Sequence, residues 1–147
     1  MTRLGWRGLS GVVLLGALGM GLMGCNDTSS GESGQNRNVK LEATKASNGQ
    51  RVEQVTLTPT AQNRLGLRTT TVVDQAGGLV VPYGALVYDN DGSTWVYVTS
   101  KPHTFLRAPV TVASIDGDNV HLTAGPDAGA EIVTVGAAEL FGAERGY

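Results

Sequence analysis

Apolar residues are distributed differently in three parts of the chain. Residues 11–24 form an apolar run without a charge, residues 26–50 are almost entirely polar, and short alternating segments fill most of the rest. In segments such as 55–57, 110–112 and 120–122, apolar residues stand two positions apart. This period of two predicts β-strands that bury one face.

Turn-forming sequences separate the alternating segments. They are DNDG at 89–92, DGDN at 116–119 and GPDAGA at 125–130, and residues of these types adopt the backbone angles of tight turns. The pattern predicts an all-β fold, a small barrel or sandwich of about seven short strands with one short helix, following a disordered tether.

The short helix is expected at 59–65. Pro59 suits the first turn, Thr58 suits the N-cap position, and Gly66 ends the helical segment. A further helical turn is expected at 136–142.

The apolar positions that face inward supply a small core, and Pro109 predicts that its strand is an edge strand or carries a bulge. A domain of this size remains marginally stable. The expected core positions are Leu79, Val81, Leu86, Val96, Val98, Val110, Val112, Val120, Leu122, Ile132, Val133 and Val135.

The N-terminal segment 1–24 has the features of an export signal. Arg3 and Arg7 precede the apolar run, no acid is present, and about 14 apolar residues are too few to span a bilayer, which needs about 20. Five glycines within the run are poor helix formers, which argues against a buried helix.

The end of this segment, Leu22-Met23-Gly24-Cys25, resembles the bacterial lipobox. The resemblance implies that the sulfur of Cys25 receives diacylglyceryl, that the chain is cut before Cys25, and that the new amine is acylated. Several acyl chains on one residue anchor stably. Asn26, in place of Asp, is weakly compatible with sorting to the outer membrane rather than retention at the inner one. The alternative is an ordinary free thiol near a processing site.

Residues 25–50 are expected to be a lipid-anchored flexible linker, because Val39 and Leu41 are their only sizeable apolar residues. Such a segment buries too little apolar surface to become ordered by itself. The folded domain is therefore placed at residues 51–147.

Charge and cysteine content exclude several classes of function. The formal net charge is −2 and no block of like charge is present, which gives no indication of nucleic-acid binding. A single cysteine excludes an internal disulfide framework and a four-cysteine zinc site.

The order of motifs from residue 79 to residue 140 resembles the C-terminal, membrane-proximal part of HlyD-like periplasmic adaptors, the membrane-fusion subunits of RND efflux pumps. The segment 55–72 resembles the part that opens the ordered region of such adaptors. The matching residues are Val81, Pro82, Ala85, Leu86, Trp95 to Val98, Arg107 to Val112, Gly117, Asp118, Val120, Gly125, Gly129, Val133, Val135, Gly136, Ala137, Glu139 and Leu140.

The chain departs from this family between residues 72 and 79, where full adaptors insert a lipoyl-like domain and a long helical hairpin. No heptad run is present, so no hairpin is expected. The resemblance implies a non-catalytic, lipid-anchored accessory protein of the bacterial cell envelope, facing the periplasm and contacting an RND transporter or full-length adaptors. The alternatives are a stand-alone envelope lipoprotein with a binding or scaffold role, and a remnant of a shortened adaptor.

Trp95 and Tyr97 are the candidate partner surface. They alternate with Val96 and Val98 on one strand, so they either form an exposed recognition pair or cover the second face of a thin barrel.

The other candidate sites have simpler interpretations. Asp89 and Asp91 resemble the start of a calcium loop, but the Glu expected at position 12 is missing, which favours a turn. His103 and His121 are the only histidines, and no G-x-S-x-G motif is present. We therefore expect no enzyme activity, no metal and no cofactor.

Overall fold

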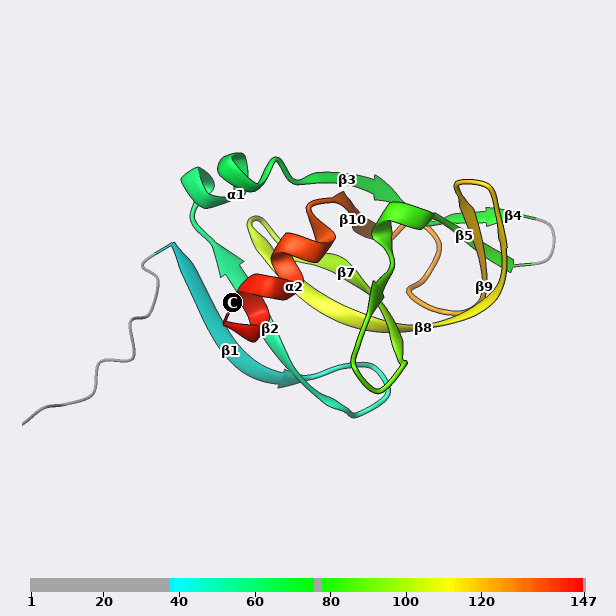
Figure 1. Ribbon diagram of the computed structural model, residues 1–147, viewed down its shortest axis with the longest axis horizontal. Helices are drawn as coiled ribbons and strands as arrows, with labels where there is room; N and C mark the ends of the chain where they lie inside the picture. The colour runs from blue at the N-terminus through cyan, green and yellow to red at the C-terminus, as the bar shows by residue number, and fades with distance from the viewer. Residues whose placement is uncertain (1–37, 76–77, 147) are drawn as a thin grey trace, which may run out of the picture. The chain divides into compact units, whose positions relative to one another are not determined.

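The computed structural model describes residues 38–75 and 78–146 (Figure 1). Across these residues it contains ten strands, two α-helices and one 3₁₀ turn. In chain order they are β1 (Val39–Lys45), β2 (Arg51–Leu57), α1 (Pro59–Leu65), β3 (Arg68–Thr71), β4 (Val73–Gln75), β5 (Gly78–Pro82), η1 (Tyr83–Ala85), β6 (Val87–Tyr88), β7 (Thr94–Lys101), β8 (Thr104–Asp116), β9 (Asn119–Ala124), β10 (Glu131–Val135) and α2 (Ala137–Arg145).

Seven of the strands form a nearly closed barrel in the order β3-β10-β7-β8-β9-β5-β4. The two strands at the ends of this order, β3 and β4, are separated in the chain by Val72 alone. The predicted fold class, a small all-β barrel, is confirmed. The additional strands β1, β2 and β6 pair outside this path, with β2 also pairing with β8.

The long strand β8 changes partners along its length. Its first part pairs with β2 and β7, and its second part, after register shifts around Val112, pairs with β9. Pro109 pairs with Trp95 of β7, and it lies between the β2-paired and β9-paired parts. Pro has no amide hydrogen to donate, and this position requires none on the second side. Pro109 therefore lies where β8 is paired on one side only, as on an edge strand, and the register shifts of β8 come later, between Thr111 and Ser114.

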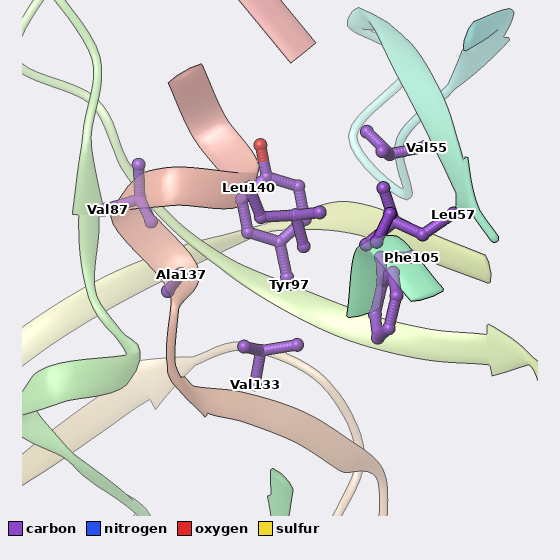
Figure 2. Packing of buried hydrophobic residues seen from close by; sticks show 9 residues of the cluster. Val55, Leu57, Val87, Tyr97, Phe105, Val133, Ala137 and Leu140 are labelled. Carbon is purple, nitrogen blue, oxygen red and sulfur yellow. The ribbon is translucent and has the colours of Figure 1, made fainter. Parts of the chain in front are cut away.

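Two hydrophobic clusters lie on opposite faces of the central strands. The barrel cluster fills the barrel interior and consists of Val72, Val81, Ala85, Val96, Val110, Val120, Leu122 and Ile132. The helix-side cluster lies between the sheet, β2 and the two helices, and consists of Val55, Leu57, Ala61, Val87, Tyr97, Phe105, Val133, Ala137 and Leu140 (Figure 2).

One expected core position is wrong. Val135 is about half exposed, because the register of β10 against β3 shifts between Val133 and Val135. A bulge of this kind inserts an extra residue and turns the following side chain to the other face.

The expected linker is wrong at its C-terminal end. Residues 39–45 form β1, which pairs with β2 through seven consecutive partners from Val39↔Leu57 to Lys45↔Arg51. Strand pairing satisfies the backbone groups of β1 without burying most of its side chains, so low apolar content did not prevent order here. The rest of the predicted linker and the predicted signal segment lie outside the described residues.

The two helices begin and end as local chemistry requires. In α1, the Thr58 hydroxyl accepts a hydrogen bond from the Ala61 amide and Gly66 is left-handed (φ 62°), which confirms the predicted helix. Helix α2 has nine residues, more than the single turn expected. It follows Gly136, whose φ of 83° is a conformation that favours glycine and where a Cβ would also meet the Leu67 side chain. Neither helix of the described part has the length and apolar character of a membrane span.

Candidate functional site

The most concentrated charge in the described part surrounds Arg107 of β8. Its side chain is buried, and the whole residue is 5% exposed. Its Nη1 donates a hydrogen bond to Asp89 Oδ2 at 2.9 Å, and its Nε lies 2.9 Å from Glu144 Oε1 without a well-aligned hydrogen bond. An arginine is rarely buried unless acids neutralise it, and here two acids do so.

Two aromatic rings lie close to the same guanidinium. The Arg107 Cζ atom lies 4.8 Å from the centroid of the Trp95 ring and 5.4 Å from that of Phe141. Arg145 lies over Phe141 at 5.1 Å and forms an ion pair with Asp89. These distances are within the range of cation–π attraction.

Glu144 of α2 is the second acid of this group and is 6% exposed. It accepts a hydrogen bond from the Tyr97 hydroxyl of β7, and its Oε1 accepts a long one, 3.5 Å, from the Glu53 amide of β2. We call Asp89, Tyr97, Arg107 and Glu144 the buried charge cluster, and the more exposed Arg145 pairs with Asp89 at its edge. The cluster connects the β6–β7 turn, β2, β7 and β8 to α2.

The surroundings shift the ionisation of two members of the cluster. Burial, together with the hydrogen bond to Glu144 and that residue's charge, raises the pKa of Tyr97 far above its usual range. Burial alone would raise the pKa of Asp89, but hydrogen bonds from Arg107 and the Asn90 amide, and the charges of both arginines, hold it below its usual value. The tyrosine therefore stays neutral and the aspartate stays charged, as a fixed structural contact requires.

Trp95 and Tyr97 do not form an exposed surface, and that prediction is wrong. Trp95 is 3% exposed and Tyr97 is 0% exposed. Both faces of β7 are covered, because Val96 faces the barrel cluster whereas Tyr97 faces the helix-side cluster (Figure 2). The alternative interpretation, that these rings cover the second face of the barrel, holds in the structure.

Among the residues that the structure describes, the large exposed aromatic side chains are Tyr83 of η1 and Tyr88 at the end of β6, each about half exposed. Burial, and next the neighbouring Tyr83 side chain, raise the pKa of Tyr88 above its usual value. Each tyrosine lies at a chain bend, after Pro82 and before the turn at Asp89, which is the sequence signal that sets them apart from the strand aromatics.

A groove of about 430 Å³ lies where the first residues of β1 meet the two helices. Its volume is within the range of small-molecule sites. Its two charged lining residues are Arg64 of α1 and Glu139 of α2. The lining residues are Asn38, Val39, Ala61, Arg64, Leu65, Glu139, Gly142 and Ala143.

The remaining candidate residues make hydrogen bonds and ion pairs within the fold. The Asp91 carboxylate accepts hydrogen bonds from the amide and hydroxyl of Ser93, so the predicted turn is confirmed, and Asp89 binds the arginines. His103 lies in the β7–β8 turn with positive φ (59°), and its Nδ1 is 2.5 Å from Gln62 Oε1.

His121 is half-buried on β9. No group of three or more His, Cys, Asp or Glu side chains suited to a metal occurs within residues 38–75 and 78–146. Cys25 and Asn26 lie outside the described residues.

Comparison of the chain with family models, with curated proteins and with solved structures finds no match.

Proposed function

We propose that this chain is a non-catalytic, lipid-anchored accessory protein of an RND-type efflux system, related in its folded part to the membrane-proximal region of periplasmic adaptors. Cys25 is the proposed lipid attachment site. The barrel is the proposed contact with a transporter or with full-length adaptor subunits.

The observation that carries the proposal is where the adaptor-like residues lie. Val81 and Pro82 end β5, Trp95 to Val98 lie in β7, and Arg107 to Val112 lie in β8. The remaining matches continue through the β8–β9 turn and β9 to Gly136 and the start of α2. The series therefore follows one continuous fold from β5 to α2, as a shared domain requires and scattered local similarities do not.

The short connection between β4 and β5 supports an adaptor-like chain that lacks the lipoyl-like domain and the helical hairpin. Val73 pairs with Val80, and Gln75 pairs with Gly78, so only residues 76 and 77 separate the two strands. Full adaptors carry their lipoyl-like domain and helical hairpin between the corresponding segments. An accessory role is therefore favoured over bridging the periplasm.

The experiment that tests this proposal is cross-linking in the native host. The full chain carries a C-terminal tag, intact cells are cross-linked, and proteins that co-purify from detergent-solubilised membranes are identified by mass spectrometry. We expect transporter subunits or hairpin-bearing adaptors to co-purify, and we expect Cys25→Ser to abolish both membrane residence and their recovery. An abundant, lipidated chain that recovers no transport component contradicts the proposal and favours the stand-alone envelope lipoprotein.

The exposed tyrosines allow the same experiment to locate the contact. If the partner binds this face, Tyr83→Ala combined with Tyr88→Ala reduces recovery at least about threefold, because exposed aromatic residues contribute heavily to protein interfaces. Ile115→Ala is the matched control, because Ile115 is equally exposed but lies on the distal part of β8. Equal recovery with all variants would place the contact elsewhere on the barrel without contradicting the accessory role.

A further inference from the structure

The first strand of the fold is an open edge. Within the described residues, β1 pairs with β2 and with no other strand, and it lies at the outer side of the described body (Figure 1). It is also the longest and most regular edge, because β3 has four residues and faces a bulge, and β4 has three. Long regular edges offer unpaired backbone groups to another strand.

The side chains of β1 are suited to pairing with the same side chains of a second, antiparallel copy of β1. Lys40 and Glu42 lie on one face of β1, Nζ to Oε1 at 2.9 Å, and the Gln54 amide donates to Glu42 at 3.3 Å. Leu41 lies between them on the other face and is 40% exposed, although it is a large apolar residue. We propose that β1 pairs antiparallel with β1 of a second copy of this chain, about a two-fold axis at Leu41.

The two-fold symmetry restricts the possible registers. An axis perpendicular to the sheet keeps each face on its own side, so the pairing centres on a residue and not between two residues. Centring on Lys40 or on Glu42 places like charges directly opposite each other, which is destabilising.

Centring on Leu41 places Lys40 of each copy opposite Glu42 of the other copy. It also places Leu41 opposite its own symmetry mate and Val39 opposite Ala43. Two opposite-charge pairs and three apolar pairs then form across the new strand boundary, so this register is more favourable than one centred on Lys40 or on Glu42.

A single strand pair buries less than the roughly 1,200 Å² of a stable interface, so we expect a weak and reversible dimer. Disulfide trapping suits such a dimer. In Leu41→Cys, the two substituted positions lie on the axis with Cα atoms about 4.5–5.5 Å apart, within the disulfide range of about 4.4–6.8 Å. The purified full chain in detergent is treated with a mild oxidant, and the disulfide dimer is measured on a non-reducing gel.

Lys45→Cys is the matched control. It substitutes an exposed residue on the same face of the same strand, but in this register its two copies lie about 27 Å apart. We expect at least about fivefold more dimer from Leu41→Cys than from Lys45→Cys. Both variants also carry Cys25→Ser, so no disulfide through residue 25 can form. Equal dimer yields, or no dimer from Leu41→Cys, would overturn the proposal.

Exchanging the two charges separates contacts between copies from contacts within one copy. Lys40→Glu and Glu42→Lys, each combined with Leu41→Cys, place like charges opposite each other in a homodimer. We expect each to form at least about fivefold less dimer than Leu41→Cys alone. Mixing the two differently tagged variants restores opposite charges only across the interface, so the mixed dimer is expected to recover.

Circular dichroism and thermal unfolding establish that each variant remains folded, which is expected because both charged residues are exposed. Single variants that dimerise as well as Leu41→Cys, or a mixture that recovers no dimer, would contradict the proposed register. This inference does not rest on the efflux proposal, because it uses purified protein without a transporter.

Discussion

The two faces of the central strands are stabilised in different ways. The barrel cluster consists only of apolar side chains, most of them β-branched or leucine, and all come from strands or the short connections between them. The helix-side cluster contains Tyr97 and lies beside the buried charge cluster, where Arg107 contacts Glu144 of α2. The barrel face is stabilised by the burial of apolar surface, whereas the helix-side face also depends on buried ion pairs.

The two faces also differ in what joins their distant segments. The barrel cluster is brought together by strand pairing, including the long-range pairs β3–β10 and β5–β9, and by apolar contacts alone. Attachment of α2 instead depends on ion pairs between residues far apart in the chain. Asp89 lies 56 positions before its partner Arg145, and Arg107 lies 37 positions before its partner Glu144. We therefore expect the two regions to respond differently to mutation.

Removing the central cation is expected to have the largest effect. Arg107→Ala removes the cation that Asp89 and Glu144 share, and leaves the buried Glu144 carboxylate without an ion-pair partner. We therefore expect the free energy of unfolding to fall by about 4 kcal/mol. Urea unfolding followed by circular dichroism measures this change. A loss below about 1 kcal/mol would show that the buried charge cluster does not stabilise the helix-side face.

Truncating a buried leucine on each face is expected to cost about 3 kcal/mol. Leu122→Ala opens a cavity in the barrel cluster, and Leu140→Ala opens one beneath α2. Equal losses are expected in urea, but only Leu140→Ala should reduce protection of α2 amides in hydrogen exchange. Loss of α2 protection in both variants would mean that the two faces unfold together.

Neutralising Asp89 is expected to give a pH-dependent effect. The pKa of Asp89 is lowered in the folded state. Its ionised form therefore stabilises the fold at pH values above its unfolded pKa of 3.8, and this stabilisation is lost as the pH falls through the folded pKa. At neutral pH, Asp89→Asn should cost about 2 kcal/mol, since hydrogen bonds to charged groups are lost.

Urea unfolding of both proteins from pH 7 to pH 2.5 tests this expectation. The difference between them should be constant at neutral pH and should shrink below about pH 3.8. A difference that grows with acid would have the wrong sign and would contradict the assigned role of Asp89.

The smallest effect is expected at the cap of α1. Thr58→Ala removes the acceptor for the Ala61 amide, at 3.2 Å, and should cost about 1 kcal/mol. Thr58→Ser keeps this hydroxyl and is the control, with a loss of no more than about 0.5 kcal/mol expected in thermal unfolding. Equal losses would point to the Thr58 methyl group instead of its hydrogen bond.

The sequence predicted the features that depend on neighbouring residues. Alternation identified Val81, Val120 and Leu122 as buried, and Thr58 with Gly66 marked both ends of α1. These signals are local, so a single sequence carries them.

The features that depend on distant contacts were missed. β1 becomes ordered because β2 pairs with it, which the polar composition of the segment does not reveal. Tyr97 is buried because α2 covers the second face of β7, and α2 is attached through the buried charge cluster. A single arginine between apolar positions of a strand, as at 107, is the sequence signal that could have revealed this cluster, although it was not used.

The most direct test of this two-face account is native-state hydrogen exchange of the full chain, comparing wild type with Arg107→Met. Methionine keeps a long apolar side chain next to Trp95 and Phe141 but removes the charge. The account predicts that α2 amides lose most of their protection while the amides of β5 and β9 keep theirs. Equal loss in α2, β5 and β9, or no loss in α2, would contradict the claim that buried charges hold the helix to a barrel stabilised by its own packing.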